Sequence, residues 1–272
     1  MPTFQHGTAV LHYEVDGSGP DAVYIPGMGS HSNDLLGQTV RQMLGQKYRL
    51  LTVDNRGSGQ TATQPNDTSN LADMADDVAA VMAHIGMDNA RVLGISMGGM
   101  VALSLAVKHP ERINRLVVAV TSARTPDNPS RSAFLLASGH LMRENNIPLE
   151  YINRHNAVML LGESVFSDMP FIVDAWVNAP PDPMGQTQAG FELQSNAILG
   201  YDVRDSLKTL NIPTLVLGSS EDMLVPPRYQ NEIVGLIPGA EIGLYPGGHV
   251  YMMLPPYTSQ FYADVLGFWG RS

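Results

Sequence analysis

Short apolar runs alternate with segments of helical periodicity along most of this chain, and this alternation limits the fold more than any other feature. Strands that are apolar on both faces must be covered on both sides, which is typical of a parallel sheet between helices. We therefore predict an α/β fold with a mostly parallel central sheet and helices on both faces. The expected strands are Ala9–Val15, Ala22–Pro26, Tyr48–Asp54, Ala90–Ile95, Arg115–Val120, Pro213–Gly218 and Ala240–Tyr245. The expected helices between them are Asn33–Gln46, Leu71–Ile85, Met97–Lys108, Arg228–Leu236 and Phe261–Trp269.

The alternation stops between residues 123 and 207. This segment contains helix-like stretches punctuated by prolines, with little strand signal, and the strand rhythm resumes after it. We therefore predict one core domain formed by residues 1–122 and 208–272, with residues 123–207 inserted as a helical cap. The expected cap helices are Arg131–Glu144, Leu149–Leu161, Phe171–Val177 and Gln188–Leu199.

The composition argues against several classes of partner and site. The 272 residues carry a net charge of −10 with no basic cluster, so nucleic acid and anionic membranes are poor partners. No cysteine is present, which excludes disulfides and thiol catalysis. No apolar run reaches the ~18 residues of a membrane span, and no secretory signal is visible. We expect a cytoplasmic protein, and the sequence leaves a homo-oligomer open.

One serine lies between two glycines at the junction of a predicted strand and helix. The stretch Gly94-Ile-Ser96-Met-Gly98 ends an apolar strand and opens an amphipathic helix. A serine held in such a turn is exposed above the sheet, and the positive end of the helix favours negative charge that develops beside it. We therefore predict that Ser96 is a catalytic nucleophile.

A serine hydroxyl needs a base, and the base needs a carboxylate. Of the eight histidines, His249 is the favoured base because it follows the last predicted strand in a glycine-rich loop. Asp222 follows the preceding strand and is the favoured carboxylate, with the neighbouring Glu221 as its rival. Asp222 precedes Pro226 by four residues, and its shorter side chain suits a rigid loop.

An oxyanion that forms during acyl transfer needs two hydrogen-bond donors. The backbone N–H of Met97, directly after the nucleophile, is the first candidate. The second is the N–H of Met28 in the glycine loop that follows an early strand.

These motifs together resemble the α/β-hydrolase superfamily over nearly the whole chain. The serine, acid and histidine occur in the order of that superfamily, and a proline replaces the histidine that usually opens its oxyanion loop. The resemblance extends to a capped subgroup that includes carboxylesterases and 3-oxoadipate enol-lactonases. The matching stretches are Pro26-Gly27-Met28-Gly29, Asp54-Asn-Arg56-Gly57-Ser-Gly59, Gly94–Gly99 and His109-Pro-Glu-Arg112, with Asp222 and His249.

The resemblance implies a serine hydrolase that cleaves a carboxylic ester or lactone through an acyl-enzyme. Residues 123–207 are rich in Met, Leu and Phe and poor in charge, which predicts a largely apolar substrate of small to medium size. No cofactor or metal is expected, because no His, Asp and Glu cluster has the spacing of metal ligands. Perhydrolases and carbon–carbon bond hydrolases use the same triad and remain alternatives. Haloalkane dehalogenases and epoxide hydrolases are disfavoured because their elbow nucleophile is an aspartate. An enol-lactonase would need a cap arginine for its acidic substrate, and a ligand receptor with slow hydrolysis is the alternative outside enzymes. The candidate arginines are Arg124, Arg131, Arg143 and Arg154.

Overall fold

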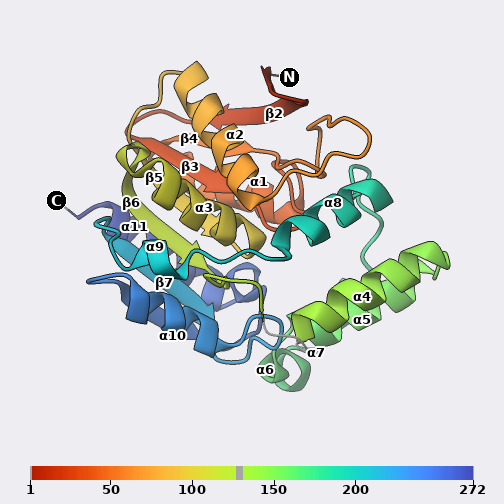
Figure 1. The fold of residues 1–272 in the computed structure, drawn as a ribbon. Coiled ribbons are helices and arrows are strands. Elements are labelled where there is room, and N and C mark those ends of the chain that lie inside the picture. The colour runs from red at the N-terminus through yellow and green to blue at the C-terminus, as the bar shows by residue number, and fades with distance from the viewer. Residues whose placement is uncertain (1, 127–130, 272) are drawn as a thin grey trace.

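An eight-stranded sheet forms the centre of the protein, in the order β1-β2-β4-β3-β5-β6-β7-β8. The computed structural model describes residues 2–126 and 131–271, with the backbone alone for residues 131–136. Strands β3 to β8 run parallel to one another, whereas β2 pairs antiparallel with both β1 and β4. The predicted fold class is confirmed (Figure 1). The strands are β1 Thr3–His6, β2 Ala9–Asp16, β3 Asp21–Ile25, β4 Arg49–Val53, β5 Ala90–Ile95, β6 Ile113–Ala119, β7 Thr214–Ser219 and β8 Glu241–Tyr245.

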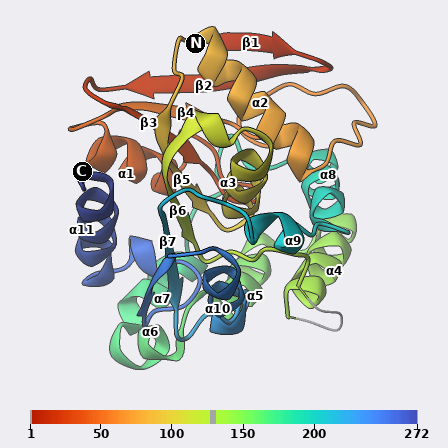
Figure 2. The same ribbon diagram turned by 60° about the vertical axis from the view of Figure 1, so that its left-hand side comes forward.

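Helices cover both faces of this sheet, which is why its central strands are almost wholly buried. Helices α2, α3 and α10 pack their apolar side chains on one face. Helices α1 and α11 pack on the other, and Figure 2 shows these two groups on opposite sides of the strands. The five helices are α1 Leu35–Leu44, α2 Leu71–His84, α3 Met97–Lys108, α10 Pro227–Leu236 and α11 Tyr257–Trp269, with short 3-10 turns at Pro110–Arg112 and Tyr251–Met253.

Local sequence signals explain where α2 begins. Asn70 accepts hydrogen bonds from the backbone N–H groups of Ala72 and Asp73, and the Asp73 carboxylate accepts from the Asn70 N–H in return. This reciprocal capping box satisfies N–H groups that the first turn of a helix otherwise leaves unpaired. Leu71, Met74 and Val78 then lie on the buried face, as their spacing predicts.

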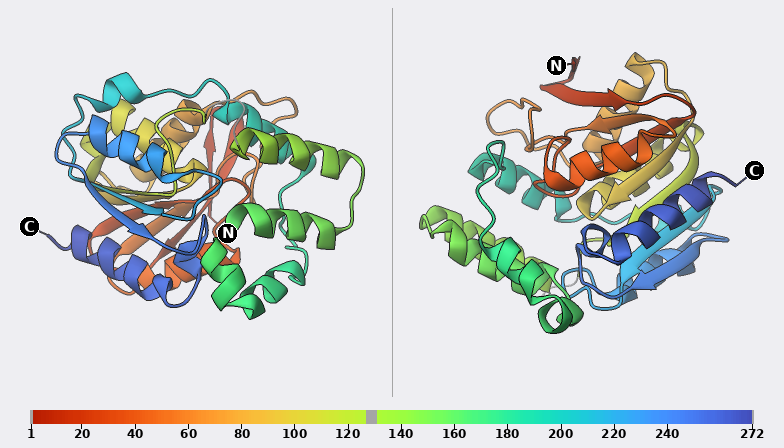
Figure 3. Two further views of the ribbon diagram at one scale, coloured as in Figure 1. Left: turned by 90° about the horizontal axis from the view of Figure 1, so that it is seen from below. Right: turned by 180° about the vertical axis from the view of Figure 1, so that it is seen from behind.

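The segment between β6 and β7, which we call the insertion, is helical in its described part. Its helices α4 to α7 project beyond the sheet (Figures 1 and 3), whereas α8 and α9 join the core on the α2–α3 face. Among the helices of residues 2–126 and 131–271, none is both long and apolar enough to cross a membrane. The insertion helices are α4 Arg131–Glu144, α5 Leu149–Leu160, α6 Glu163–Asp168, α7 Pro170–Val177, α8 Gln188–Ile198 and α9 Arg204–Leu207.

The chain enters and leaves the insertion side by side. The Thr125 N–H donates to the Tyr201 carbonyl at 2.7 Å, and the Val203 N–H donates to the Ala123 carbonyl at 2.9 Å. These two hydrogen bonds join the two ends of the insertion, close to the boundaries predicted for the cap. That residues 123–207 act as a separate cap stays a prediction.

Candidate active site

Ser96 occupies a strained turn between β5 and α3. Its backbone has a φ of 56° and a ψ of −122°, a conformation that a residue other than glycine keeps only when its surroundings hold it. The Ser96 N–H donates to the Ala119 carbonyl at 2.8 Å, and its carbonyl accepts from the Thr121 hydroxyl at 2.7 Å. A Cβ on Gly98 would lie 2.0 Å from the Ile25 carbonyl oxygen, so the motif glycine is required for this close approach. The turn is therefore fixed by the packing of α3 against β3 and β6.

His249 reaches this serine from the loop that follows β8. Its Nε2 lies 2.9 Å from the Ser96 Oγ, and the histidine is almost fully buried. The backbone N–H of His249 donates to the Leu160 carbonyl of the insertion at 2.7 Å. The preceding Gly248 forms a backbone bridge to Leu161. The imidazole is thus held partly by the core and partly by the end of α5.

Asp222 completes a chain of hydrogen bonds. Its Oδ2 lies 2.7 Å from the Nδ1 of His249, while its Oδ1 accepts from the N–H groups of Leu224 at 2.9 Å and Val225 at 2.8 Å. A carboxylate can only accept, so Nδ1 carries the proton and Nε2 is left free to accept from the Ser96 hydroxyl. The structure therefore brings Ser96, His249 and Asp222 together in the arrangement that suits nucleophilic catalysis.

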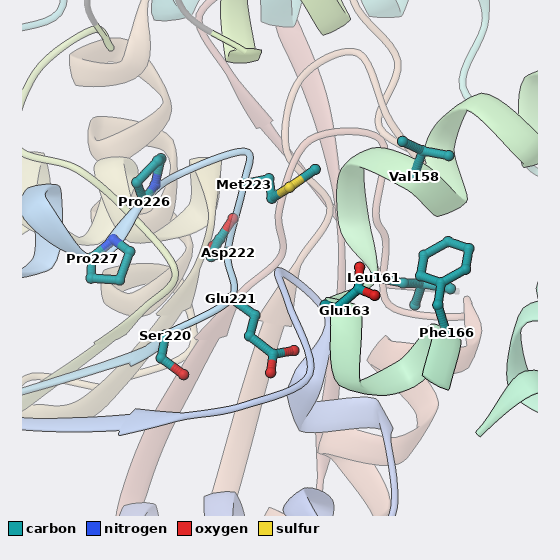
Figure 4. Close-up of a pocket in the computed structure, with 10 residues that line it drawn as sticks. All are labelled: Val158, Leu161, Glu163, Phe166, Ser220, Glu221, Asp222, Met223, Pro226 and Pro227. Atoms are coloured by element: carbon teal, nitrogen blue, oxygen red, sulfur yellow. The ribbon is translucent and has the colours of Figure 1, made fainter. Parts of the chain in front are cut away.

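Glu221 turns away from the imidazole. Its Oε2 accepts from the Ser164 hydroxyl at 2.7 Å and from the N–H groups of Ser164 and Gly247, each at 3.1 Å. Burial raises the pKa of Glu221, but these hydrogen bonds outweigh it and leave the pKa below its usual value. Figure 4 shows the side chains of Glu221 and Asp222 leaving their loop in different directions. The structure thus places Asp222, and not Glu221, against His249.

The two residues predicted to donate to an oxyanion lie in segments that meet at Ser96. Met97 is the first residue of α3, directly after the serine. Met28 belongs to the loop after β3, where a Cβ on Gly27 would come within 3.3 Å of the Ser96 Cβ and 3.2 Å of the Ile95 carbonyl oxygen. That the Met28 and Met97 amides bind an oxyanion stays a prediction.

Insertion residues that no sequence signal marked also reach this site. Gln194 of α8 accepts a hydrogen bond from the Gly29 N–H, and Ser164 of α6 contacts Glu221. Each of these contacts joins residues that are distant in the chain, so no motif of fixed spacing could have revealed them.

An open groove of about 610 Å³ lies beside Asp222, between the α5–α6 corner and the loop after β7 (Figure 4). Ser96 and His249 are absent from its described lining, so a substrate carbonyl bound there would not face the serine. The described lining residues are Val158, Leu161, Glu163, Phe166, Ser220, Glu221, Asp222, Met223, Pro226 and Pro227.

The loop that carries Asp54 and Arg56 braces the core. The Arg56 guanidinium forms buried ion pairs with Asp77 at 2.6 Å and Asp67 at 2.9 Å. Asp54 lies 2.9 Å from the Nδ1 of His12. Burial raises the pKa of Asp54, but the His12 ring and nearby backbone N–H groups more than compensate, so the pKa is lowered. These side chains are occupied by structural contacts.

Two of the four candidate arginines pair with carboxylates. Arg124 lies 3.2 Å from Glu232, and Arg154 lies 2.8 Å from Glu150 within one exposed helical face. The side chain of Arg131 lies outside the described residues.

Arg143 differs from these. Its guanidinium lies 4.8 Å from the centre of the Phe191 ring and donates to the Gln186 carbonyl at 3.0 Å. No carboxylate among the described residues pairs with it, and burial lowers its pKa. In the described ranges, no three His, Asp or Glu side chains form a group that could hold a metal ion.

Comparisons with known proteins give consistent results. The sequence profile of the alpha/beta hydrolase fold family matches residues 23–256. The protein named "Putative carbamate hydrolase RutD" from Caulobacter sp. (strain K31) is 29% identical over 239 residues, which cover 84% of this chain and 82% of the relative. The crystal structure of the enol-lactonase from Burkholderia xenovorans LB400 has a TM-score of 0.82 at 20% identity, covering 99% of this chain and 100% of that one. The structure of a thermophilic esterase from Thermogutta terrifontis has a TM-score of 0.77 at 24% identity, covering 96% of this chain and 93% of that one.

Proposed function

Since this chain belongs to the alpha/beta hydrolase fold family, we propose that it is a serine hydrolase that cleaves a carboxylic ester or lactone through an acyl-enzyme. The observation that carries the proposal is the hydrogen-bonded chain from the Ser96 Oγ through His249 to Asp222. The strained Ser96 backbone supports it as well, because strain of this kind gathers at functional sites.

The reaction follows from the direction of these hydrogen bonds. The Ser96 Oγ attacks the substrate carbonyl while the Nε2 of His249 takes its proton, and ionised Asp222 stabilises the imidazolium. The Met28 and Met97 amides donate to the oxyanion of the tetrahedral intermediate. When the intermediate collapses, the carbon–oxygen bond to the leaving group breaks and His249 returns the proton to that oxygen. A water molecule then attacks the carbonyl carbon of the acyl-enzyme while the Nε2 of His249 takes its proton. The bond between that carbon and the Ser96 Oγ breaks, His249 returns the proton to Oγ, and the acid is released.

The insertion is proposed to act as the cap that selects the substrate. Helix α8 packs into the main core, whereas α5 and α6 form a separate apolar cluster with Leu254. We propose that the substrate binds between these helices and the carboxyl ends of the strands, where a largely apolar acyl group of small to medium size would fit.

Carbamate cleavage by the same steps is a second candidate, because the Caulobacter relative carries that name over most of its length. Enol-lactone hydrolysis is another, for which Arg143 is the described cap arginine without a carboxylate partner. Perhydrolysis, carbon–carbon bond cleavage and a receptor with slow hydrolysis also fit the same residues.

A substrate panel with covalent labelling tests the proposal. Wild-type protein should turn over short-chain p-nitrophenyl esters or lactones faster than matched carbamates, and a fluorophosphonate should label one residue, Ser96. Ser96→Ala should lose labelling and turnover, while Ser220→Ala, at an exposed serine, should keep both. Stoichiometric labelling of Ser96→Ala would refute the nucleophile. Stoichiometric labelling of wild type with no turnover would favour a receptor.

A further inference from the structure

Helix α8 of the insertion touches the core backbone directly. A Cβ on Gly190 would lie 2.2 Å from the Gly57 carbonyl oxygen, and a Cβ on Gly57 would lie 2.8 Å from the Gly190 carbonyl oxygen. Such a distance is too short for any side chain, so the two glycines allow the backbones to meet. This contact fixes the height of α8 above the loop between β4 and α2.

One helical turn further along α8, Gln194 is fully buried and makes three hydrogen bonds. Its Oε1 accepts from the Gly29 N–H at 2.8 Å and from the Gln186 Nε2 at 2.7 Å, and its Nε2 donates to the Arg56 carbonyl at 2.8 Å. The backbone partners are a fixed donor and a fixed acceptor, so they set the orientation of the side-chain amide. An ionised glutamate here would place an oxygen against the Arg56 carbonyl oxygen.

The Gly29 N–H that Gln194 binds belongs to the turn that carries Met28. The Ser30 N–H donates to the Gly27 carbonyl at 3.2 Å, which makes Met28 and Gly29 the central residues of the turn. Gly29 has a φ of 71°, as the third residue of a type II turn requires. Rotation of the Met28–Gly29 peptide would break the bond to Gln194, so that bond selects one form of the turn.

We propose that Gln194 is a positioning residue for the oxyanion loop, which makes α8 of the insertion part of the support for the transition state. The Gln194 side chain does not reach Ser96 in any described contact. It acts by holding the Met28–Gly29 peptide in one form of the turn, which restricts the conformation of Met28, the residue whose N–H we propose as an oxyanion donor. The inference rests on the proposed function, because it concerns the oxyanion of that reaction.

Kinetics per active site test this inference. The variants are Gln194→Met, which keeps volume but removes all three bonds, and Gln194→Glu, which disturbs the bond to Arg56. Asn196→Met also replaces a carboxamide side chain by methionine, at an exposed position of α8, and is the control. Active sites are titrated with a fluorophosphonate, so that kcat is expressed per reactive serine and misfolded protein is not counted.

Removal of one oxyanion donor costs about 10²–10³-fold in kcat, and a misdirected donor should cost less. Gln194→Met should therefore lower kcat about 10- to 100-fold, with KM within about threefold of wild type. The rate of fluorophosphonate labelling and the affinity for an alkylboronic acid should fall in parallel, because both adducts place an oxygen at the same donors. The acidic limb of the pH profile should stay in place, because His249 and Asp222 are untouched.

An unchanged kcat per titrated serine in Gln194→Met, with only a lower melting temperature, would overturn the inference. If Gln194→Met does not fold, Gln186→Met tests the inference instead, because it removes one donor to the Gln194 Oε1. A loss of kcat smaller than that expected for Gln194→Met, at constant KM, supports the inference. An unchanged kcat refutes it. Wild-type protein that neither labels nor turns over any ester or lactone would refute the proposed function itself. The two failures are therefore distinguishable.

Discussion

Replacing Asp222 by asparagine should leave the fold intact and reverse the tautomer of His249. In the structure, the Asp222 Oδ1 accepts from the Leu224 and Val225 N–H groups, at 2.9 Å and 2.8 Å. Asparagine has one acceptor oxygen, and these two donors should claim it. Its NH₂ group would then face the Nδ1 of His249 and donate to it, so the ring proton would move to Nε2. A protonated Nε2 cannot take a proton from the Ser96 hydroxyl.

The size of the effect follows from those two N–H groups. The opposite orientation of the asparagine amide would restore the useful tautomer but leave both N–H groups without an acceptor. Each N–H group left without an acceptor costs about 1–3 kcal/mol. The amide orientation that keeps the proton on Nδ1 is therefore disfavoured by about 2–6 kcal/mol. At 1.36 kcal/mol per tenfold, kcat should fall between about 30-fold and about 10⁴-fold. The upper end matches the ~10⁴ loss from the same substitution in a serine protease.

Glu221→Gln is the matched control for this experiment. Its amide oxygen can still accept from the Ser164 and Gly247 donors that Glu221 binds, so kcat should change only a few-fold. Both variants are purified, their melting temperatures are compared with wild type, and kcat is measured on one ester. A near-normal Asp222→Asn beside a strongly impaired Glu221→Gln would refute the assignment of the acid.

Two further predictions concern the substrate and the stability. With esters of increasing acyl length, kcat/KM should rise by up to about fourfold per methylene, from ~0.8 kcal/mol per buried methylene, until the pocket is full. A strong gain from a free carboxylate on the substrate, lost in Arg143→Gln, would favour the enol-lactonase alternative. Because contacts in the folded state lower the pKa of Asp54, its ionised form stabilises the protein above the unfolded-state pKa of about 3.9. This stabilisation should disappear as the pH falls through the lower folded-state pKa. Urea midpoints should therefore show Asp54→Asn less stable than wild type at pH 7, with the difference shrinking in acid; a constant difference would contradict this.

Strong local patterns predicted most of the fold. The predicted strand over 90–95 and the predicted helices over 97–108 and 131–144 agree with β5, α3 and α4. The edge strand β1 was not predicted, because its four residues Thr3–His6 are partly polar and only half covered. Helices α6 and α9 were also missed, since six and four residues are too few to show a helical period.

The residues of the candidate site also fall into two groups, those that local sequence predicts and those that only the fold brings together. A motif predicts Ser96 because the strained turn and its glycines lie within a few neighbouring residues. The spacing to Pro226 and the shorter side chain favoured Asp222 over Glu221, and the structure places Asp222 against His249. Gln194 could not be predicted, because its partner Gly29 lies 165 residues away and only the docking of α8 brings them together. Their roles in a reaction stay predictions.

The bridge between the α5–α6 corner and the His249 loop bears on how the protein is made. A ribosome synthesises Ser96 153 residues before His249, so the serine emerges first. Until β8 has paired and the Leu160 carbonyl accepts the His249 N–H, Ser96 lacks the base proposed for it and is an ordinary alcohol. The nascent chain should therefore be unable to attack cellular esters during translation, and reactivity should arise only when the C-terminal segment docks.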